Sequence, residues 1–502
     1  MKSEFFRYCE QGYTHVPLVR QTFADFDTAL SCYLKLADQP YSYLFESVQG
    51  GEQWGRYSII GLPCRERIVV RDAQLVRYLD DMSVETVSTT DPLGWIEAFQ
   101  SQFKVPESDH LPRFSGGLVG CFGYDTIQYI EPKVRQAYKR QGKASGSDEM
   151  VLLVSEEVAV FDNLSGKLSL IVHAKPDQYE HHQAAYDQAQ QRLDQLEALL
   201  RKPLNIHALS DQPSHRITEA DFVPNLDDAE YAEIVERAKS YIYAGDVMQV
   251  VPSRRFSVDF PVEPINLYRS LRSLNPSPYM YFVNLNDRHI VGSSPEILVR
   301  LEAETITLRP IAGTRRRGHS VEEDEALKQE LLTDPKEIAE HVMLIDLGRN
   351  DVGRVSEVGQ VELTERMTVE KYSHVMHIVS NVVGKLKSGL TAFDVLKATF
   401  PAGTISGSPK VRAMEIIAEL EPSPRGFYSG AIGYIGWNGN MDTAIAIRTA
   451  VIQQGRLHVQ AGGGIVYDSI AKLENKETRN KARAMFRAAE LAANNLKEAG
   501  DD

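Results

Sequence analysis

Two segments of the chain each place two glutamates three residues apart. The pairs are Glu337 and Glu340 in TDPKEIAEHVMLIDLGRNDVGR (333–354), and Glu474 and Glu477 in LENKETRNKARAMFRAAELAA (473–493). Residues three or four apart lie on one face of a helix, and carboxylate oxygens are the ligands that Mg²⁺ prefers. Together the segments predict a site for one divalent cation, although each pair alone is more commonly a solvated helix face.

Glu337 also has a purely structural explanation. Asp334 is placed as a helix N-cap and Pro335 as the first helical residue, so Glu337 can complete a capping box. Glu340 has no such explanation, because it shares a helix stripe with Leu344 and therefore points toward the core. The sequence leaves both interpretations of Glu337 open.

Other polar residues suit an anionic ligand. Arg448 lies in the apolar run TAIAIRTAVI (443–452), where an unpaired guanidinium would be costly, so its partner is either a protein acid or a substrate carboxylate. The run VQAGGGIVYDS (459–469) is a strand entering three glycines, which let backbone N–H groups approach a ligand. Lys481 shares the stripe of Glu477. Tyr428 and His377 are weaker signals, because a lone Tyr or His more often has a structural role.

Several helices and strands must position these residues. Beyond the two glutamate helices, we predict a helix from 229 capped by Asp228, a polar helix at 178–202 and a hairpin within 147–174. The length of 502 residues indicates two large units. We place them at 1–202 and 229–495, joined by a connector at 203–228 that has three prolines and no clean periodicity.

Two glycine-rich stretches echo each other across these units. They are SGGLVGCFGYD (115–125) and SGAIGYIGWNG (429–439). They are either independent strands or traces of a distant duplication, and the sequence does not decide between the two.

Composition excludes several classes of function. Lys and Arg number 55 against 69 Asp and Glu, a net charge of −14, which argues against a nucleic-acid partner. No window approaches about 18 uninterrupted apolar residues, so we expect no membrane span, and the N-terminus lacks a signal-peptide core. The four cysteines form no C-x-x-C pair, which favours reduced thiols in a cytoplasmic protein.

A series of motifs between about 229 and 495 resembles the chorismate-utilising enzymes, and among them the anthranilate synthase component I family. In the family's order they are GSSPEILV (292–299), RPIAGTRRRG (309–318), DPKEIAEHVMLIDLGRNDVGR (334–354), VEKYSHVMHIVSNVVG (369–384), FPAGTISGSPKVRAMEII (400–417), RGFYSGAIGYI (425–435), DTAIAIRTA (442–450), VQAGGGIVYDS (459–469) and ETRNKARA (477–484). The resemblance implies an α/β fold of the α+β type. This fold is a two-layer sandwich of large, mainly antiparallel sheets with helices outside and the active site in the cleft between them.

The resemblance also implies roles at matching positions. Glu340 and Glu477 would bind Mg²⁺ directly, and Glu337 and Glu474 through water. The metal would hold the ring carboxylate of chorismate, and Glu296 and His377 would transfer protons. The remaining substrate-binding residues would be Gly313, Thr314, Thr404, Tyr428, Arg448, Gly462, Gly463, Gly464 and Lys481. Here the glycine run is Ala-Gly-Gly-Gly, where the family usually has Ala-Gly-Ala-Gly.

The family's chemistry explains these residue types. A nucleophile adds at C2 of the ring while the C4 hydroxyl leaves, and loss of the C2 proton and of pyruvate gives the aromatic product. Hydroxide is a poor leaving group, so an acid such as Glu296 must protonate it. Burial could raise the pKa of that acid enough for it to be protonated near neutral pH.

The position of Ala312 distinguishes members of the family. Relatives that form aminodeoxychorismate typically carry a lysine there, so Ala312 favours direct attack by ammonia. Water as nucleophile would instead give an isochorismate or salicylate synthase. No glutaminase motif is present, and no cysteine follows Cys121, so we expect a separate glutamine amidotransferase subunit, component II, as partner. The three arginines at 315–317 are expected to form a solvated loop.

Two further motifs suggest regulation. LFESVQGGEQWGRYSIIG (44–61) resembles the family's N-terminal effector motif, and NPSPYM (275–280) accompanies it. The residues that match the family's L-tryptophan pocket are Glu46, Ser47, Pro278, Tyr279 and Met280. NPSPYM is also an ordinary turn sequence before a strand. A non-catalytic regulator is the alternative from another class, but such a protein should have lost Glu296 or a metal carboxylate.

Overall fold

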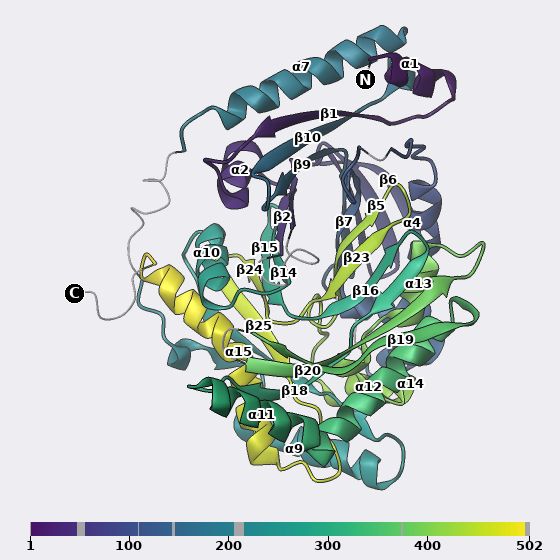
Figure 1. Cartoon of the computed structure of the whole chain (residues 1–502). Helices are drawn as coiled ribbons and strands as arrows, with labels where there is room; N and C mark the ends of the chain where they lie inside the picture. The colour runs from purple at the N-terminus through teal and green to yellow at the C-terminus, as the bar shows by residue number, and fades with distance from the viewer. Residues whose placement is uncertain are drawn as a thin grey trace.

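The structure is a computed structural model that describes residues 2–47, 56–108, 110–142, 146–204, 215–372 and 375–496. Two large antiparallel sheets form its centre, and helices cover their outer faces (Figure 1). The first sheet has eleven strands in the order β1 (Val16–Phe23), β10 (Lys167–Ala174), β9 (Glu157–Asp162), β3 (Tyr57–Gly61), β2 (Ser42–Glu46), β14 (Tyr279–Asn284), β15 (Arg288–Ser294), β24 (Thr449–Gln453), β25 (Arg456–Gly462), β13 (Ser253–Asp259) and β11 (Val223–Pro224).

The second sheet has twelve strands. Eleven follow the order β18 (Ile311–Arg316), β20 (Val375–Leu386), β17 (Thr305–Leu308), β16 (Ile297–Glu302), β23 (Met441–Ile445), β22 (Ala431–Gly436), β7 (Gly117–Phe122), β8 (Met150–Ser155), β4 (Glu66–Arg71), β5 (Gln74–Leu79) and β6 (Met82–Ser88). β19 (Ser356–Lys371) pairs with β20, and a small separate sheet joins β12 (Gln249–Val250) to β21 (Gly407–Ser408). The predicted fold class is thereby confirmed.

The helices lie in groups outside the sheets. α1 (Lys2–Glu10), α2 (Ala29–Leu36) and α7 (His182–Leu200) cover the first sheet at the top of Figure 1. α10 (Pro264–Leu274) and α15 (Ala471–Ala493) pack on the same sheet lower down, and α9 (Asp228–Tyr243), α11 (Val321–Thr333) and α12 (Pro335–Gly353) lie at the bottom. The others are α4 (Pro92–Gln100), α5 (Ile127–Ile130), α6 (Pro132–Arg140), α13 (Ala392–Thr399), α14 (Lys410–Leu420) and the short 3₁₀ turns η1 (Tyr124–Thr126), η2 (Pro176–Gln178), η3 (Glu219–Asp221) and η4 (Gly403–Ile405). No helix among the described residues is long and apolar enough to cross a membrane.

Both sheets contain strands from each half of the chain. β2 pairs with β14, so that Glu46 lies opposite Met280, and β7 pairs with β22, so that Phe122 lies opposite Ala431. The predicted boundaries at 1–202 and 229–495 therefore do not separate the sheets, and they stay a prediction about chain segments. Within the predicted connector, residues 205–214 lie outside the described residues, whereas β11 is already a strand of the first sheet.

The two glycine-rich stretches prove to be neighbouring strands. Gly120 of β7 lies opposite Gly433 of β22. A Cβ atom on Gly120 would come within 2.0 Å of the Val151 carbonyl oxygen, and one on Gly433 within 2.1 Å of the Asp442 carbonyl oxygen. Only glycine fits at these positions, because the neighbouring backbone leaves no room for a side chain.

The local predictions are largely confirmed. Helices α12 and α15 occupy the two glutamate segments, and β9 and β10 form the predicted hairpin, with Asp162 opposite Lys167. One correction is that residues 147–162 form two strands, because the chain crosses from the second sheet to the first at Glu156. The Glu156 carboxylate binds Lys175 at 2.6 Å and His15 at 3.1 Å at this crossing.

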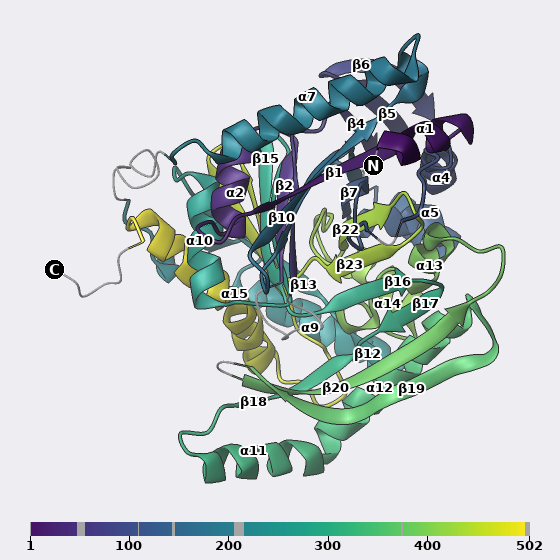
Figure 2. The same ribbon diagram turned by 45° about the horizontal axis from the view of Figure 1, so that its top comes forward.

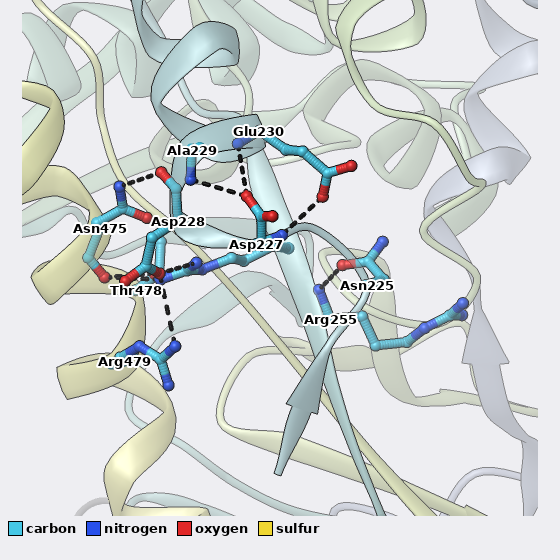
Figure 3. A network of polar contacts seen from close by, with 10 residues as sticks. Asn225, Asp227, Asp228, Ala229, Glu230, Arg255, Asn475, Thr478 and Arg479 are labelled. Carbon is cyan, nitrogen blue, oxygen red and sulfur yellow. Dashed lines mark hydrogen bonds and ion pairs between the residues drawn. The ribbon is translucent and has the colours of Figure 1, made fainter. Parts of the chain in front are cut away.

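The start of α9 also differs by one residue from the prediction. Asp227, not Asp228, is the N-cap: its carboxylate accepts the N–H groups of Ala229 and Glu230 at 2.8 Å (Figure 3). Asp228 is released to pair with Arg254.

Candidate active site

A cavity of about 210 Å³ lies where strand ends of both sheets meet α12 and α15. It brings together most of the residues that the sequence selected, from segments up to 185 residues apart. The selected residues that line it are Glu296, Gly313, Thr314, Glu340, His377, Thr404, Tyr428, Arg448, Gly462 and Lys481. Ala312 lies in the same wall.

Glu296 is a buried acid at the junction of β15 and β16. Thr404 donates a hydrogen bond to its Oε1 at 2.9 Å, and the backbone N–H of Ile445 donates to its carbonyl oxygen at 3.0 Å. Burial raises the pKa of Glu296 to about 7, and the hydrogen bond from Thr404 only partly opposes this effect. The carboxyl group is therefore substantially protonated near neutral pH and can act as an acid.

His377 lies on β20 and faces β18. Its Nδ1 is 2.8 Å from the carbonyl oxygen of Gly313 and 3.1 Å from Oγ1 of Thr314. Because a carbonyl oxygen only accepts hydrogen bonds, Nδ1 carries the proton and Nε2 is left as an acceptor. Burial lowers the pKa of His377, so the ring is neutral near pH 7.

Arg448 lies between two strands rather than within one. The apolar run 443–452 is not one continuous strand: it is interrupted after β23, and Arg448 adopts a left-handed conformation with φ of 49° before β24 begins. Within the part of the chain that the structure describes, its guanidinium forms no ion pair or hydrogen bond, and burial lowers its pKa. The nearby Glu296 interacts with it electrostatically but does not pair with it, so this cation can bind an anion that enters the cavity.

Tyr428 is a second group suited to an anion. It is buried in the same wall, and burial raises the pKa of its phenol, so the hydroxyl stays protonated and can donate a hydrogen bond.

The four predicted metal carboxylates fall into two environments. Glu340 and Glu474 form no ion pair with a described residue: burial raises both pKa values, and the neighbouring Glu337 raises that of Glu340 further. Glu477 instead pairs with Lys481 at 2.8 Å, and Glu337 accepts a hydrogen bond from Arg315 at 3.0 Å. No capping box forms at α12, so the structural explanation of Glu337 is wrong.

These carboxylates fit a divalent cation in their chemistry. Oε2 of Glu474 is buried without a hydrogen-bond partner, which is costly for a carboxylate unless a cation or water satisfies it. Hard oxygen donors of this kind suit Mg²⁺. As placed among the described residues, no three acidic, His or Cys side chains are grouped closely enough to hold a metal alone. Waters or substrate oxygens would have to complete the shell.

The arginine run is not a solvated loop. β18 extends through Arg316, and Arg315 forms ion pairs with Glu330 at 2.8 Å and Asp334 at 2.7 Å in addition to Glu337. Arg317 pairs with Asp324 at 2.8 Å. The expectation failed because acidic residues of α11 and α12, which pack beside β18, supply the partners.

The glycine run closes another wall of the cavity. Lys481 donates to the carbonyl oxygen of Gly462 at 3.0 Å. The N–H of Gly463 already donates to Pro252 at 3.3 Å, whereas that of Gly464 donates to no described residue. A Cβ atom on Gly463 would lie 2.9 Å from Oε2 of Glu474, so glycine lets this carboxylate approach the backbone.

A buried network fixes the helix that carries Glu474, Glu477 and Lys481. Arg254 of β13 donates to Thr478 at 3.0 Å and to the carbonyl oxygen of Asn475 at 3.0 Å, and it pairs with Asp228 at 2.7 Å. Asn475 in turn donates to the carbonyl oxygen of Asp228 at 2.9 Å, so α9, β13 and α15 are joined at one point (Figure 3).

Sequence reasoning missed two kinds of residue here. Gln249 and Gln460 line the cavity, and Gln249 forms a hydrogen bond with Glu340. The sequence signal for Gln249 was a polar amide within the apolar run VMQVVP. Arg425, fully buried, pairs with Glu421 at 2.7 Å and donates to the carbonyl oxygen of Ile405 at 2.8 Å, beside Thr404. Arg425 begins the motif RGFYSGAIGYI, but the sequence gives no sign that its charge is buried.

Comparison with known proteins identifies the family. The family model described as chorismate binding enzyme matches residues 43–487. Anthranilate synthase component 1 of Pseudomonas aeruginosa is 56% identical over 491 residues, which cover 98% of this chain and 99% of that protein. The chain belongs to the anthranilate synthase component 1 family. The Aquifex aeolicus member of the anthranilate synthase component 1 family is 44% identical over 98% of both chains.

Solved structures agree with this assignment. Anthranilate synthase component I from Streptococcus pneumoniae superposes with a TM-score of 0.75 at 37% identity, covering 93% of this chain and 99% of that one. The menaquinone-specific isochorismate synthase MenF from Escherichia coli, 19% identical over 97% of this chain and 98% of its own, has a TM-score of 0.69 and shares the fold. The motifs seen in the sequence therefore belong to the anthranilate synthase component 1 family.

A second cavity, of about 740 Å³, lies between the two sheets. All five residues that matched the effector pocket of the anthranilate synthase component 1 family line it: Glu46, Ser47, Pro278, Tyr279 and Met280. Glu46 is buried and accepts hydrogen bonds from Tyr268 and, at 3.0 Å, from Arg272. Residues 48–55 of the N-terminal effector motif lie outside the described residues.

Proposed function

We propose that this member of the anthranilate synthase component 1 family converts chorismate and ammonia to anthranilate, pyruvate and water, the first step of tryptophan biosynthesis. The observation that carries the proposal is that one cavity holds both a buried acid with a raised pKa and a buried guanidinium. Glu296 has a pKa of about 7, and Arg448 forms no ion pair or hydrogen bond with a described residue. Chorismate needs an acid for its C4 hydroxyl and cations for its two carboxylates.

The reaction follows from these groups. Arg448 and Tyr428 bind the enolpyruvyl carboxylate and orient the ring. Glu296 protonates the C4 hydroxyl, which leaves as water while ammonia forms a bond to C2. The C2 proton then passes to one of the two available acceptors, the Glu296 carboxylate or Nε2 of His377, and pyruvate leaves to complete the aromatic ring.

Mg²⁺ would be held by Glu340 and Glu477, with Glu337 and Glu474 acting through bound water. When bound, the metal polarises the ring carboxylate and stabilises negative charge as the double bonds shift. Lys481 and Arg315 form ion pairs with Glu477 and Glu337, respectively, and so orient these two carboxylates. The buried Oε2 of Glu474 supports this assignment.

The nucleophile is assigned from Ala312. This residue is buried in the cavity wall and has no amine, so the nitrogen must come from free ammonia. Ammonia is mostly protonated at neutral pH, so we infer delivery from a partner, the component 2 glutamine amidotransferase. The cytoplasmic location expected from the sequence is consistent with such a biosynthetic enzyme.

The 740 Å³ cavity is proposed to bind L-tryptophan as a feedback inhibitor. Its walls combine aromatic and apolar side chains with charged groups at the edges, including Glu46 and Arg300. This combination suits an amino acid with a large aromatic ring. Met280 of β14 lies opposite Ser293 of β15, and Glu296 follows β15 directly in the chain. Occupancy of one cavity can thus alter the other.

The decisive experiment mixes the protein with chorismate, Mg²⁺ and an ammonium salt at alkaline pH and measures the fluorescence of anthranilate. Absence of product from folded protein would contradict the proposal. Isochorismate or salicylate would show that water is the nucleophile, and accumulation of an aminated intermediate would indicate an aminodeoxychorismate or aminodeoxyisochorismate synthase. Glu340→Gln should abolish turnover, and full activity in that variant would refute the metal assignment.

A further inference from the structure

A buried ion pair lies behind the wall of the catalytic cavity. Arg425 and Glu421 are each 4% exposed, and hydrogen bonds of 2.7, 3.0 and 3.2 Å join the guanidinium to both carboxylate oxygens. Glu421 is the C-cap of α14. Figure 2 shows α14 in the lower half of the molecule, together with α12 and β20, which carry Glu340 and His377. Neither Arg425 nor Glu421 lines the cavity, so each could act on a substrate only through other residues.

The guanidinium of Arg425 holds the backbone of two wall segments. It donates to the carbonyl oxygen of Ile405 at 2.8 Å and to that of Val251 at 2.6 Å. Both of these residues line the cavity, and Ile405 directly follows Thr404, which donates its hydrogen bond to Glu296. Because a guanidinium is rigid and planar, it fixes how these two segments lie relative to each other.

The same guanidinium contacts the segment that carries Tyr428. The centre of the Tyr428 ring lies 5.6 Å from the guanidinium carbon, within the range of a cation–π contact. The Arg425 Nη1 also donates to Oγ of Ser429 at 3.4 Å. Ser429 has a φ of 65°, a conformation that is rare for a residue with a side chain and persists only where the surroundings impose it. Arg425 therefore helps to fix the backbone that presents the Tyr428 hydroxyl to the cavity.

The carboxylate of Glu421 extends these contacts to another part of the wall. Its Oε1 accepts hydrogen bonds from the N–H of Ser253 at 2.7 Å and from the Ser253 hydroxyl at 2.8 Å. The same hydroxyl accepts from the side-chain amide of Gln460 at 2.8 Å, and Gln460 lines the cavity. The ion pair thus links the wall segments at 251–253, 404–405, 428–429 and 460.

Residues from the first half of the chain enclose the ion pair on another side. The ring centre of Tyr124 lies 4.5 Å from the guanidinium carbon of Arg425, and the Tyr124 N–H donates to the carbonyl oxygen of Gly426 at 2.8 Å. The N–H of Gly426 donates to Oδ2 of Asp125 at 3.3 Å. Tyr124 and Asp125 are fully buried. The guanidinium is therefore held between aromatic rings and away from bulk water.

Stability alone does not explain a buried ion pair. Taking two charges out of water costs free energy that their attraction only partly recovers, and apolar side chains of similar size often stabilise a fold equally well. An ion pair of this kind instead supplies hydrogen bonds in fixed directions. Here those bonds end on the backbone and side chains of the cavity wall.

We propose that Arg425 and Glu421 are positioning residues that set the separation between the acid Glu296 and the carboxylate-binding Tyr428. This inference rests on the proposed function. The C4 hydroxyl and the enolpyruvyl group of chorismate are on neighbouring ring carbons, so the acid and the carboxylate-binding groups must be held at a matching separation. The ion pair holds both at once, Glu296 through the segment of Thr404 and Tyr428 through its own backbone and ring.

The test neutralises the ion pair without leaving one buried charge uncompensated, because removal of a single partner destabilises a fold strongly. The variant is Glu421→Gln with Arg425→Met, called here the neutral variant. Its new amide can still accept from Ser253, whereas the donors to Ile405 and Val251 are lost. We would measure thermal unfolding, chorismate binding without a nitrogen source, and kcat and KM as a function of pH with an ammonium salt.

The matched control neutralises a buried ion pair elsewhere in the chain. Arg288 and Asp148 pair at 3.0 Å, are 8% and 5% exposed, and do not line the catalytic cavity. The control variant is Asp148→Asn with Arg288→Met. It should leave KM for chorismate and the pH profile unchanged.

The neutral variant should unfold cooperatively, bind chorismate more weakly with a raised KM, and have a kcat/KM about 10- to 100-fold below that of the wild type. The limb of the pH profile that reports Glu296 should move to higher pH, because Thr404 is no longer held against the acid. Adding Thr404→Val should move this limb no further, since both changes act through one hydrogen bond. A merely structural role would lower the unfolding midpoint and leave KM and the limb unchanged.

A folded neutral variant with the KM and pH profile of the wild type would overturn the inference, and so would an equal change in the control variant. If the neutral variant does not fold, Arg425→Lys carries the test. Lysine keeps the charge but lacks the planar fork that reaches both carbonyl oxygens, so KM and the limb should shift in the same directions, and wild-type values would overturn the inference. Absence of anthranilate from the wild type with the ammonium salt would instead refute the proposed function itself.

Discussion

Replacing Glu296 by glutamine should make the protein more stable and inactive at the same time. Glu296 has a pKa of about 7 in the folded chain, against 4.5 when unperturbed. A raised pKa means that ionising the group costs free energy in the fold. The cost is absent below pH 4.5, where the acid is protonated in both states; it grows as the pH rises toward 7 and is constant above it. One pKa unit corresponds to about 1.4 kcal/mol, so the cost above pH 7 is about 3 kcal/mol.

The Glu296→Gln variant keeps the shape of the side chain and lacks this cost. For a chain of this length the entropy of unfolding is about 1 kcal/mol per degree, so about 3 kcal/mol corresponds to a rise of about 3 °C in the unfolding midpoint. We expect this rise at pH 8 and expect it to vanish toward pH 4.5. Turnover near and below pH 7, where the wild-type acid is protonated, should fall by about 10²- to 10⁴-fold, because an amide cannot donate the proton.

The measurements are thermal unfolding scans of both proteins between pH 4.5 and 8.5, together with the pH profile of kcat/KM with ammonium salt. Glu304→Gln, an exposed glutamate between β16 and β17, is the control and should change neither quantity. A midpoint difference that does not depend on pH would refute the assignment of the raised pKa to Glu296. Retained turnover would refute its role as the acid.

Three other changes test the site and its regulation. Thr404→Val removes the hydrogen bond that lowers the pKa of Glu296, so the limb of the pH profile that reports the acid should move to higher pH. An unchanged limb would show that this hydrogen bond does not influence the pKa of the acid. Arg448→Met should raise KM for chorismate about 10- to 100-fold, the value of one or two hydrogen bonds to a charged group. It should also raise the unfolding midpoint, because it removes a buried cation that forms no ion pair with a described residue. Steady-state kinetics and unfolding scans measure the two effects, and an unchanged KM would contradict the binding role. Ser47→Phe should relieve inhibition by tryptophan while turnover without tryptophan stays near that of the wild type; undiminished inhibition would place the effector elsewhere.

The sequence predicted those features that depend on local spacing. The Glu337–Glu340 and Glu474–Glu477 pairs lie on helices because their spacing and the Asp334–Pro335 start are local signals. The β9–β10 hairpin was predictable for the same reason, since its turn residues and flanking runs are contiguous. The fold class and most of the cavity residues came from the family resemblance rather than from periodicity.

The remaining features depend on contacts between distant segments. Alternation within residues 147–162 cannot show that β8 and β9 belong to different sheets. Arg315 looked solvated because its partners, Glu330, Asp334 and Glu337, come from helices later in the chain. The positive φ of Arg448 is rare for a residue with a side chain, and only the surrounding strands impose it.

The sharing of both sheets between the two chain halves bears on how the protein is made. β2 and β7 emerge from the ribosome long before one of their two neighbours, which is β14 for β2 and β22 for β7. Until then each presents an unpaired edge rich in apolar residues, the kind of surface that drives aggregation. The N-terminal segment therefore cannot finish folding before synthesis is nearly complete, and a chain truncated before β22 leaves that edge open. Pairing of β2 with β14 and of β7 with β22 therefore requires both halves of the chain to be present.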